Sequence, residues 1–502
     1  MISESTLPEK PCIHLDENIH LLNELLGADI SWDIIHKEFH FGGIRMYSYC
    51  INGFFYTQSL VNILKDVSRI MEEYVSEHDK IEIQKLQSYL NTHISFVQVS
   101  TASNMRDILY FILSGPIVFL FDGLQEALII DTRVYPSRNP SEPEVERVVR
   151  GPRDGFTETM LTNTALIRRR LRDPKLRIEL FRVGKRSKTD VSLLYIADIT
   201  NPQLIDEIRK QIKAIDIDGI PMADGALIDY LTDQKTKWNI YPSVRLTERP
   251  DVAATALLEG QIVVIIDTTP EALILPCVFL QHVQHPDDYH LSPFAGTYFR
   301  LALLGSLIIS IFLSPLWLAL VGLGTALPQW LMFINPDNES QIPLTLQLLI
   351  LEFGVDIFRR AVVNTPVPMA SAIGFVSAVI FSQLAVKAKL FDTDVLVYTT
   401  MCAMTQYATA SLELSNANRV ARVFLILITG IFSVFHLGWL GFLIGIIILF
   451  IGLLRKRAFG IPYLWPLIPF NWEAFQDILF RQPFKNKAHR PSIFRPIDPT
   501  RK

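Results

Sequence analysis

The chain has 502 residues, of which 49% are apolar and 20% are charged, and its formal net charge is −4. This length exceeds one globular core, the mean hydropathy of +0.27 indicates lipid-facing segments, and the small net charge argues against a general nucleic-acid binder. The four cysteines have neither metal-ligand spacing nor a small-disulfide pattern, so reduced thiols are expected.

The N-terminal part alternates predicted helices with predicted strands. Its first 18 residues lack a basic start followed by an apolar run, so no secretory signal is expected and this part is predicted to stay in the cytoplasm. A Pro- and Ser-rich joint at 136–143 divides it. The pattern predicts an α/β head of two subdomains, residues 1–140 and 141–292, with no evident internal repeat. Helices are expected at 60–74, 82–90, 155–172, 202–215 and 250–258, and strands at 117–121, 127–131, 176–183, 191–196 and 262–266.

The last 200 residues contain stretches long enough to cross a bilayer, which takes roughly 20 residues of helix. Residues 301–320 form the clearest span, and the uncharged stretch 361–386 is rich in small residues that favour close helix packing. Residues 395–412 are at the lower limit. Residues 423–454 are too long for one crossing, and form either a tilted helix or a hairpin broken near 436–438.

A fifth segment, residues 342–358, is apolar but carries charge, as a pore-lining, re-entrant or interfacial helix would. Four charged residues share one helix face there: Glu352, Asp356, Arg359 and Arg360. A charge in hydrocarbon costs about 3 kcal/mol or more, so this face should point at water, a partner helix or a pore. An ion pathway is one interpretation, and an Asp356–Arg360 pair that closes an interface is the other.

Charge asymmetry predicts the topology. Ten Lys or Arg and three acids follow Leu454, whereas the loop 327–341 has two acids and no base. The positive-inside rule places the tail in the cytoplasm and that loop outside. We therefore expect an α-helical polytopic membrane domain at 293–455, with four to six segments of which one is re-entrant, and a basic cytoplasmic tail at 456–502. Polar residues after the third span are predicted at the cytoplasmic mouth: Glu413, Asn416, Asn418 and Arg419.

A basic stretch at 150–188 holds twelve Lys or Arg against four acids. It fits an anionic ligand or lipid headgroups, but a solvated helix face or a subunit contact is the commoner explanation. The residues assigned to this subunit or anion contact are Arg153, Arg168, Arg169, Arg170 and Arg172.

Three histidines, at positions 282, 285 and 290, lie beside two aspartates just before the first span. Their side chains are of metal-ligand type, yet a polar interfacial linker is more usual, and no metal is predicted. No GxGxxG, Walker A, HExxH or GxSxG motif is present, so the sequence gives no argument for an enzyme or a cofactor.

Several short motifs together resemble the A-subunit family of spore germinant receptors, the GerA type, over residues 40–495. They are GPRDGF at 151–156, NTALIRRR at 163–170, PKL at 174–176, DG at 218–219, TERPD at 247–251, LEG at 258–260, PY at 462–463, Pro466, PF at 469–470 and RP at 490–491. Receptor A subunits carry Arg-x-Pro in the second membrane segment, where this chain has Asn364-Thr365-Pro366 after a retained Glu352. That variant, with LSNANR at 414–419, resembles the stage V sporulation protein AF branch.

The resemblance implies a homo-oligomer, of five copies, in the inner membrane of a bacterial spore, which conducts monovalent ions and acts with other spore membrane germination proteins. The pore or gating residues would be Glu352, Asp356, Arg359, Arg360 and Asn364. A non-conducting scaffold that assembles germination proteins, and a nutrient-responsive receptor A subunit, are the alternatives. A solute transporter is disfavoured because the membrane part shows no repeat symmetry.

Overall fold

The computed structural model describes residues 7–78, 82–93, 98–134, 151–220, 222–232, 238–285, 287–288, 291–323, 334–336, 340–363, 390–409, 411–483 and 489–501. The chain forms two compact units. The head unit comprises Met1–Thr232, Leu246–Pro276 and Lys487–Lys502, and the membrane unit comprises Asp233–Arg245 and Cys277–Asn486. The tail that was predicted as a separate region, 456–502, is thus divided between the two units.

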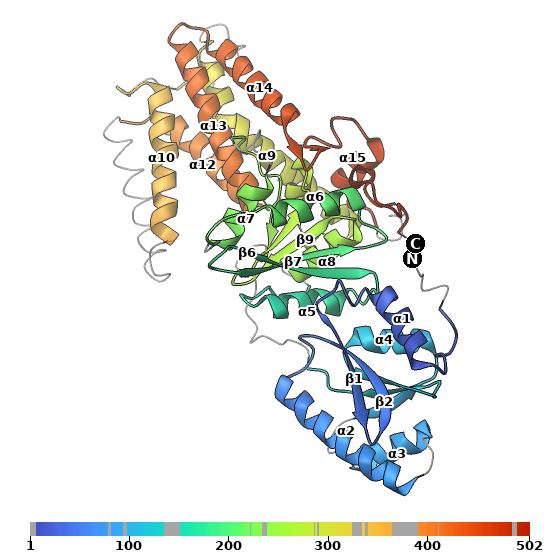
Figure 1. Cartoon of the computed structure of the whole chain (residues 1–502). Helices are drawn as coiled ribbons and strands as arrows, with labels where there is room; N and C mark the ends of the chain where they lie inside the picture. Colours follow the sequence, from blue (N-terminus) through green and yellow to red (C-terminus); the bar gives the residue numbers. More distant parts are fainter. Residues whose placement is uncertain are drawn as a thin grey trace. The chain divides into compact units, whose positions relative to one another are not determined.

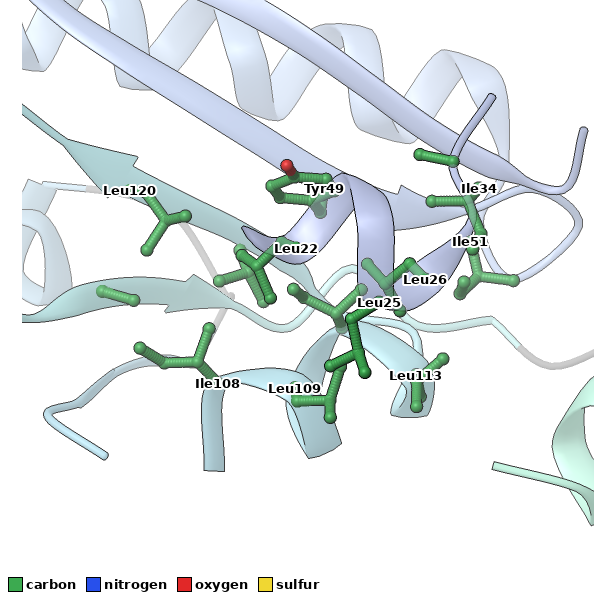
Figure 2. Close-up of a cluster of buried hydrophobic side chains, with 14 of the residues drawn as sticks. Leu22, Leu25, Leu26, Ile34, Tyr49, Ile51, Ile108, Leu109, Leu113 and Leu120 are labelled. Atoms are coloured by element: carbon green, nitrogen blue, oxygen red, sulfur yellow. The ribbon is translucent and has the colours of Figure 1, made fainter. Parts of the chain in front are cut away.

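The first subdomain of the head is a five-stranded antiparallel sheet in the order β1-β2-β4-β5-β3, with helices on both faces (Figure 1). Strands β4 and β5 are buried along their whole length, because α1 and α4 cover one face and α2 and α3 cover the other. Figure 2 shows leucines of α1 and α4 packed together beneath Tyr49 of β2. The elements are α1 (Leu15–Leu26), β1 (Ile34–Phe41), β2 (Ile44–Ile51), α2 (Thr57–Glu77), α3 (Ile83–His93), β3 (Val99–Ala102), α4 (Met105–Ser114), β4 (Ile117–Phe121) and β5 (Ala127–Ile130).

The second subdomain is also a five-stranded sheet, in the order β6-β7-β9-β10-β8. Its core contains residues of α5 and α8 packed on the central strands. The elements are α5 (Met160–Arg170), β6 (Leu176–Val183), β7 (Thr189–Ile196), α6 (Pro202–Lys213), α7 (Ala223–Leu231), β8 (Arg245–Thr247), α8 (Pro250–Leu258), β9 (Ile262–Ile266) and β10 (Ala272–Leu275). The predicted α/β head of two subdomains is confirmed.

The two subdomains repeat one another. Each has a helix, a strand pair, two helices, a strand, a helix and a second strand pair, and the two strand orders correspond position by position. The turn after the first strand of the second pair also corresponds. Asp122 accepts a hydrogen bond from the backbone N–H of Leu15 at 3.1 Å, and Asp267 accepts one from that of Met160 at 3.0 Å. In both subdomains an aspartate in the turn thus caps the first helix.

The next residue of each turn has a left-handed backbone, with φ of 81° at Gly123 and 71° at Thr268. No internal repeat was predicted, but the sequence contains one short repeated motif. Glu-Ala-Leu-Ile occurs at 126–129 and again at 271–274, each time leading into or along the last strand of its sheet.

A buried ion pair joins the two subdomains within the head unit. The Arg168 guanidinium donates to both Asp33 oxygens, at 2.8 and 3.2 Å, and to the carbonyl of Leu176 at 3.2 Å. Nearby, Arg177 donates to the carbonyls of Leu25 and Leu26 at 3.0 and 2.9 Å, where α1 ends. These bonds hold the end of α1 and the start of β1 against β6.

The C-terminal residues of the chain return to the second subdomain. The Ile497 N–H donates to the carbonyl of Ile199 at 2.9 Å, and Arg501 pairs with Glu259 at 2.9 Å. Arg490 donates to the carbonyl of Leu258 at 2.9 Å. The last described residues of the tail therefore form part of the head unit.

The membrane unit is helical (Figure 1). Among the described residues, three helices are long and apolar enough to cross a membrane: α9, α13 and α14. The elements are the 3₁₀ helix Phe279–Val283, α9 (Pro293–Val321), α10 (Leu344–Val363), α12 (Thr393–Tyr407), α13 (Leu412–Ser433), α14 (Gly438–Arg455), β11 (Arg457–Ala458), β12 (Ile461–Pro462) and α15 (Trp472–Leu479); a further 3₁₀ helix of the head unit is Ser492–Phe494.

Two predictions about the spans can be compared with these helices. The span 301–320 lies inside α9, and the hairpin alternative for 423–454 is confirmed, because α13 ends at Ser433 and α14 begins at Gly438. The stretch 395–412 forms α12, which ends at Tyr407. The span predicted at 361–386 lies outside the described residues after Val363.

Candidate functional site

Helix α10 carries the charged face that the sequence singled out. Leucine and isoleucine dominate its first half, and Pro343, whose carbonyl accepts from Leu346 and Gln347, precedes it. Gln347 fixes this end of the helix to the start of α12, since its amide donates to the Asp392 carboxylate at 3.1 Å and accepts from the Asp392 N–H at 2.9 Å.

The innermost charged residue of α10 forms a two-pronged ion pair with α13. Arg422 donates to both Glu352 oxygens, at 2.7 and 2.8 Å. The two side chains are only 1% and 2% exposed. Arg422 also donates to the carbonyl of Ser310 on α9 and to the side-chain oxygen of Gln406 on α12 at 3.1 Å. Side chains or backbone of four helices thus meet at one buried arginine.

Two further contacts continue along the same pair of helices. Asp356 pairs with Arg419, and Arg359 donates to the Asn416 side-chain oxygen at 2.9 Å. Positions 352, 356 and 359 therefore face positions 422, 419 and 416, as antiparallel helices require. We call these three contacts the α10–α13 ladder. Burial decreases along it, because the Asp356 side chain is already 41% exposed.

The two helices approach closely at the other end. A Cβ added at Gly430 of α13 would lie 2.1 Å from Thr345 Cγ2 of α10. A side chain at this position would therefore push α10 away from α13, and glycine allows the approach that brings the ladder together.

The remaining predicted pore or gating residues have different surroundings. Arg360 is exposed, and Asp356 pairs with Arg419 where the interface alternative expected an Asp356–Arg360 pair. Asn364 lies outside the described residues. The ladder contains three of the predicted residues, Glu352, Asp356 and Arg359. Their role in gating stays a prediction.

The residues predicted at the cytoplasmic mouth lie within α13, because this helix begins at Leu412. Asn416 and Arg419 belong to the ladder. Asn418 is fully buried, and its side-chain amide has no hydrogen-bond partner in the part of the chain that the structure describes. An unpartnered buried amide costs about 1–3 kcal/mol, so a bound water or small ligand would be favoured beside it.

The first turn of α13 joins the buried linker before α9. Ser411 caps α13 by accepting from the Leu414 N–H at 3.3 Å, and its hydroxyl contacts the Glu413 carboxylate at 2.5 Å. His282 Nδ1 lies 3.2 Å from the same hydroxyl. Burial, with a smaller contribution from Arg245, lowers the pKa of His282 to about 3, so this imidazole is neutral at physiological pH. The described residues contain no group of three or more His, Cys, Asp or Glu arranged to hold a metal ion.

The basic stretch of the head does not form one surface. Arg168 is buried in its pair with Asp33, so it is an internal structural residue where the sequence placed a subunit or anion contact. Arg170 pairs with Asp154 at 2.6 Å, and Arg172 donates to the Tyr110 hydroxyl at 3.1 Å. Three of the set, Arg153, Arg169 and Arg172, are exposed.

Arg422, which organises the site, was not predicted from the sequence. The fourth span was predicted to begin at residue 423, and this start left the arginine outside it. A helix that starts at Leu412 instead places Arg419 and Arg422 inside an apolar helix, where charged residues are rare and mark functional or structural contacts. Ser411, a residue type that caps helices, was the sequence signal that this helix begins at Leu412.

The fold and the site together define a membrane protein with a duplicated α/β head and a helix bundle crossed by buried ion pairs. A family model described as Bacillus/Clostridium GerA spore germination protein matches residues 20–493. The chain belongs to this GerA family of spore germination proteins.

Two relatives in sequence agree with this assignment. Stage V sporulation protein AF of Bacillus subtilis (strain 168) is 34% identical over 480 residues, which cover 96% of this chain and 95% of that protein. Spore germination protein B1 of the same organism is 29% identical over 490 residues, covering 96% and 98%. The crystal structure of the N-terminal domain of the A subunit of the Bacillus megaterium spore germinant receptor GerK3 is 29% identical, covers 55% of this chain and 98% of that domain, and has a TM-score of 0.40.

Proposed function

We propose that the protein is a subunit of a membrane oligomer that conducts monovalent ions during spore germination, and that the described arrangement is its closed state. The observation that carries this proposal is the Glu352–Arg422 pair inside an apolar helix bundle. Charged groups at such depth are expensive, and membrane proteins retain them mainly along ion paths, at switches or between helices.

The ladder supports a specific way of gating. Its inner contact is buried and doubly bonded, whereas its outer contacts are partly exposed, so the outer contacts would separate first when α10 moves along α13. Separation would release Asp356 and Arg359 toward a hydrated path. In this scheme Glu352 acts as a latch within its own subunit, and copies of α10 from a ring of subunits surround the pore.

The setting of this activity is part of the proposal. The GerA family and three candidate spans support a membrane protein of germination. We place it in the spore inner membrane, with the head and the basic tail on the cytoplasmic side, as a pentamer that acts with other germination proteins.

Ion flux from liposomes that contain the purified full-length protein tests the proposal. We expect flux from the wild type, and a higher resting flux from Glu352→Gln and Asp356→Asn, because each removes one charge of a closing contact. Arg182→Gln, an exposed position on β6 of the head, is the control and should leave the resting flux unchanged. A folded oligomer without flux in all four proteins would contradict the proposal.

A non-conducting scaffold is the second candidate. It is favoured by the complete pairing of Glu352 within a single chain, which a purely structural contact also explains. In that case Glu352→Gln would lower stability without changing flux, and copurification of other germination proteins would depend on the exposed Arg153 and Arg169 of the head.

A further inference from the structure

The chain does not leave the membrane unit where α14 ends. Residues 456–483 fold back against the first turns of α9, and they are fixed there by buried side chains that include Tyr463, Leu464 and Ile478. These pack with Leu307 of α9 and with Leu453, close to the end of α14. The segment therefore lies at the end of the bundle where α9 begins and α14 ends.

Hydrogen bonds hold α15 rigidly on α9. Arg300 of α9 donates to the carbonyls of Asp477 and Phe480 at 3.0 and 3.4 Å, and so caps the end of α15. The Arg481 N–H donates to the Thr297 hydroxyl at 3.1 Å. A Cβ at Gly296 would lie 3.0 Å from Arg481 Cγ, so the two segments are in direct contact.

The outer surface of this segment is apolar and aromatic although its inner surface is already packed. Leu467, Ile468, Phe470 and Trp472 are exposed, with Phe470 at 63%. The ring centroids of Phe470 and Trp472 are 6.1 Å apart, so they form one patch. Exposed aromatic residues of α9 lie at the same end of the bundle: Phe294 and Tyr298.

Apolar side chains of α9 are also exposed further along the helix. Beyond Tyr298, α9 exposes Leu301 and Ile308, which lie within its membrane-spanning stretch. Two exposed arginines, Arg455 and Arg457, lie at the end of α14, at the end of the bundle where α9 begins. Aromatic side chains mark the bilayer–water interface, and cationic side chains near it attract anionic headgroups.

We propose that residues 465–472, named here the interfacial segment, lie in the headgroup layer of the bilayer, and that their partner is an anionic lipid surface. Arg455 and Arg457 supply the attraction to the headgroups, while Phe470 and Trp472 enter the acyl boundary. This binding goes beyond the proposed conduction and does not depend on it. It fixes the depth of the first turns of α9 through Arg300.

Fluorescence quenching in nanodiscs of the full-length protein tests this assignment. Single cysteines for an environment-sensitive probe are placed at Phe470→Cys or Trp472→Cys, in a Cys12→Ser background because the other three native thiols are buried. Ile447→Cys, exposed in the middle of α14, is the control for lipid, and Glu72→Cys, exposed on α2, is the control for water.

At positions 470 and 472 we expect loss of most of the emission with lipids that carry a nitroxide near the headgroup, and little loss with iodide in the buffer. Position 447 should respond to nitroxides deeper in the chain, and position 72 to iodide alone. Protection at 470 should increase when phosphatidylglycerol is added to phosphatidylcholine, and Arg455→Gln with Arg457→Gln should abolish that increase.

Three results would overturn the proposal. Iodide quenching at 470 as strong as at 72 would place the segment in water. Protection from both iodide and nitroxide lipids would mean that protein, such as a second copy of the chain, covers it. Equal protection with and without phosphatidylglycerol would exclude the anionic surface as the partner.

Discussion

The head unit and the membrane unit each depend on a buried arginine that binds a carboxylate with two hydrogen bonds. Arg168 and Asp33 join the two subdomains of the head, and Arg422 and Glu352 join α13 to α10. Both pairs are almost inaccessible to solvent. Both arginines also donate to backbone carbonyls, and the pairs differ in that the second is one end of a ladder that reaches solvent.

From this difference we infer that the head pair is a fixed joint between the subdomains and that the ladder is a contact that can move. In the head, Arg177 reinforces the pair, because its guanidinium donates to the carbonyls of Leu25 and Leu26 at the end of α1. In the membrane unit, α10 exposes Leu346, Ile350 and Phe353, and the contacts that it makes with the described helices through the ladder lie on another face. Fewer contacts would be broken if α10 moved.

The largest expected effect comes from removing one member of each pair. Asp33→Asn and Glu352→Gln each leave a buried arginine without its counter-charge, which destabilises by about 3–5 kcal/mol. Thermal unfolding of the solubilised full-length protein measures both losses. If the head is a fixed joint and α10 is movable, Asp33→Asn lowers stability alone, whereas Glu352→Gln also changes the protease sensitivity of α10.

Matched variants complete this comparison. Arg182→Gln removes an arginine from an exposed pair with Asp190 and should change the unfolding temperature little. Replacing both buried partners, as in Glu352→Gln with Arg422→Met, should recover part of the stability, because no unpaired charge remains. Equal losses from the exposed and the buried arginine would show that burial does not set the strength of these pairs.

The head could be predicted from its sequence more fully than the ladder. Continuous apolar runs such as 262–266 gave the buried strands directly, and Pro202 after Asn201 marked the start of α6. The duplication was not predicted, because the two copies share a pattern of elements more than residues. The ladder could be predicted only on the α10 side, since its partners depend on which face of α13 turns inward, and hydropathy alone does not define that face.

The membrane unit should also be the more sensitive of the two to mild acid, through His282. Its pKa is lowered to about 3 in the folded chain and returns to about 6.5 on unfolding, so the unfolded state binds more protons between these values. Stability therefore falls as the pH decreases below about 6.5, by about 1.4 kcal/mol per pH unit. Unfolding temperatures measured from neutral pH to about pH 5 should fall less for His282→Gln than for the wild type. Parallel curves would contradict a buried neutral imidazole.

Asn418 offers a smaller test of whether the interior of the helix bundle holds a bound water or ligand. If its amide has no partner, Asn418→Leu removes an unsatisfied group at similar volume and should raise the free energy of unfolding by about 1–3 kcal/mol. If a bound water or ion satisfies it, the same change should lower both stability and flux. Val420→Leu, at an exposed position of the same helix, serves as the control.

The smallest expected effect concerns the head alone and uses its duplication as an internal control. Gly123 and Thr268 occupy corresponding turns with left-handed backbones, a conformation that costs residues other than glycine about 1–2 kcal/mol. Thr268→Gly should therefore stabilise the head by up to about 1 kcal/mol, after allowance for the greater freedom of glycine in the unfolded chain. Gly123→Thr should destabilise it by a similar amount, and no atom lies within 4 Å of the added Cβ, so backbone strain alone is measured.

Hydrogen exchange of the strands β4, β5, β9 and β10 reports each subdomain separately. Opposite changes in the two subdomains would show that each turn stabilises its own sheet, whereas a joint change would mean that the Asp33–Arg168 pair makes the two subdomains unfold as one.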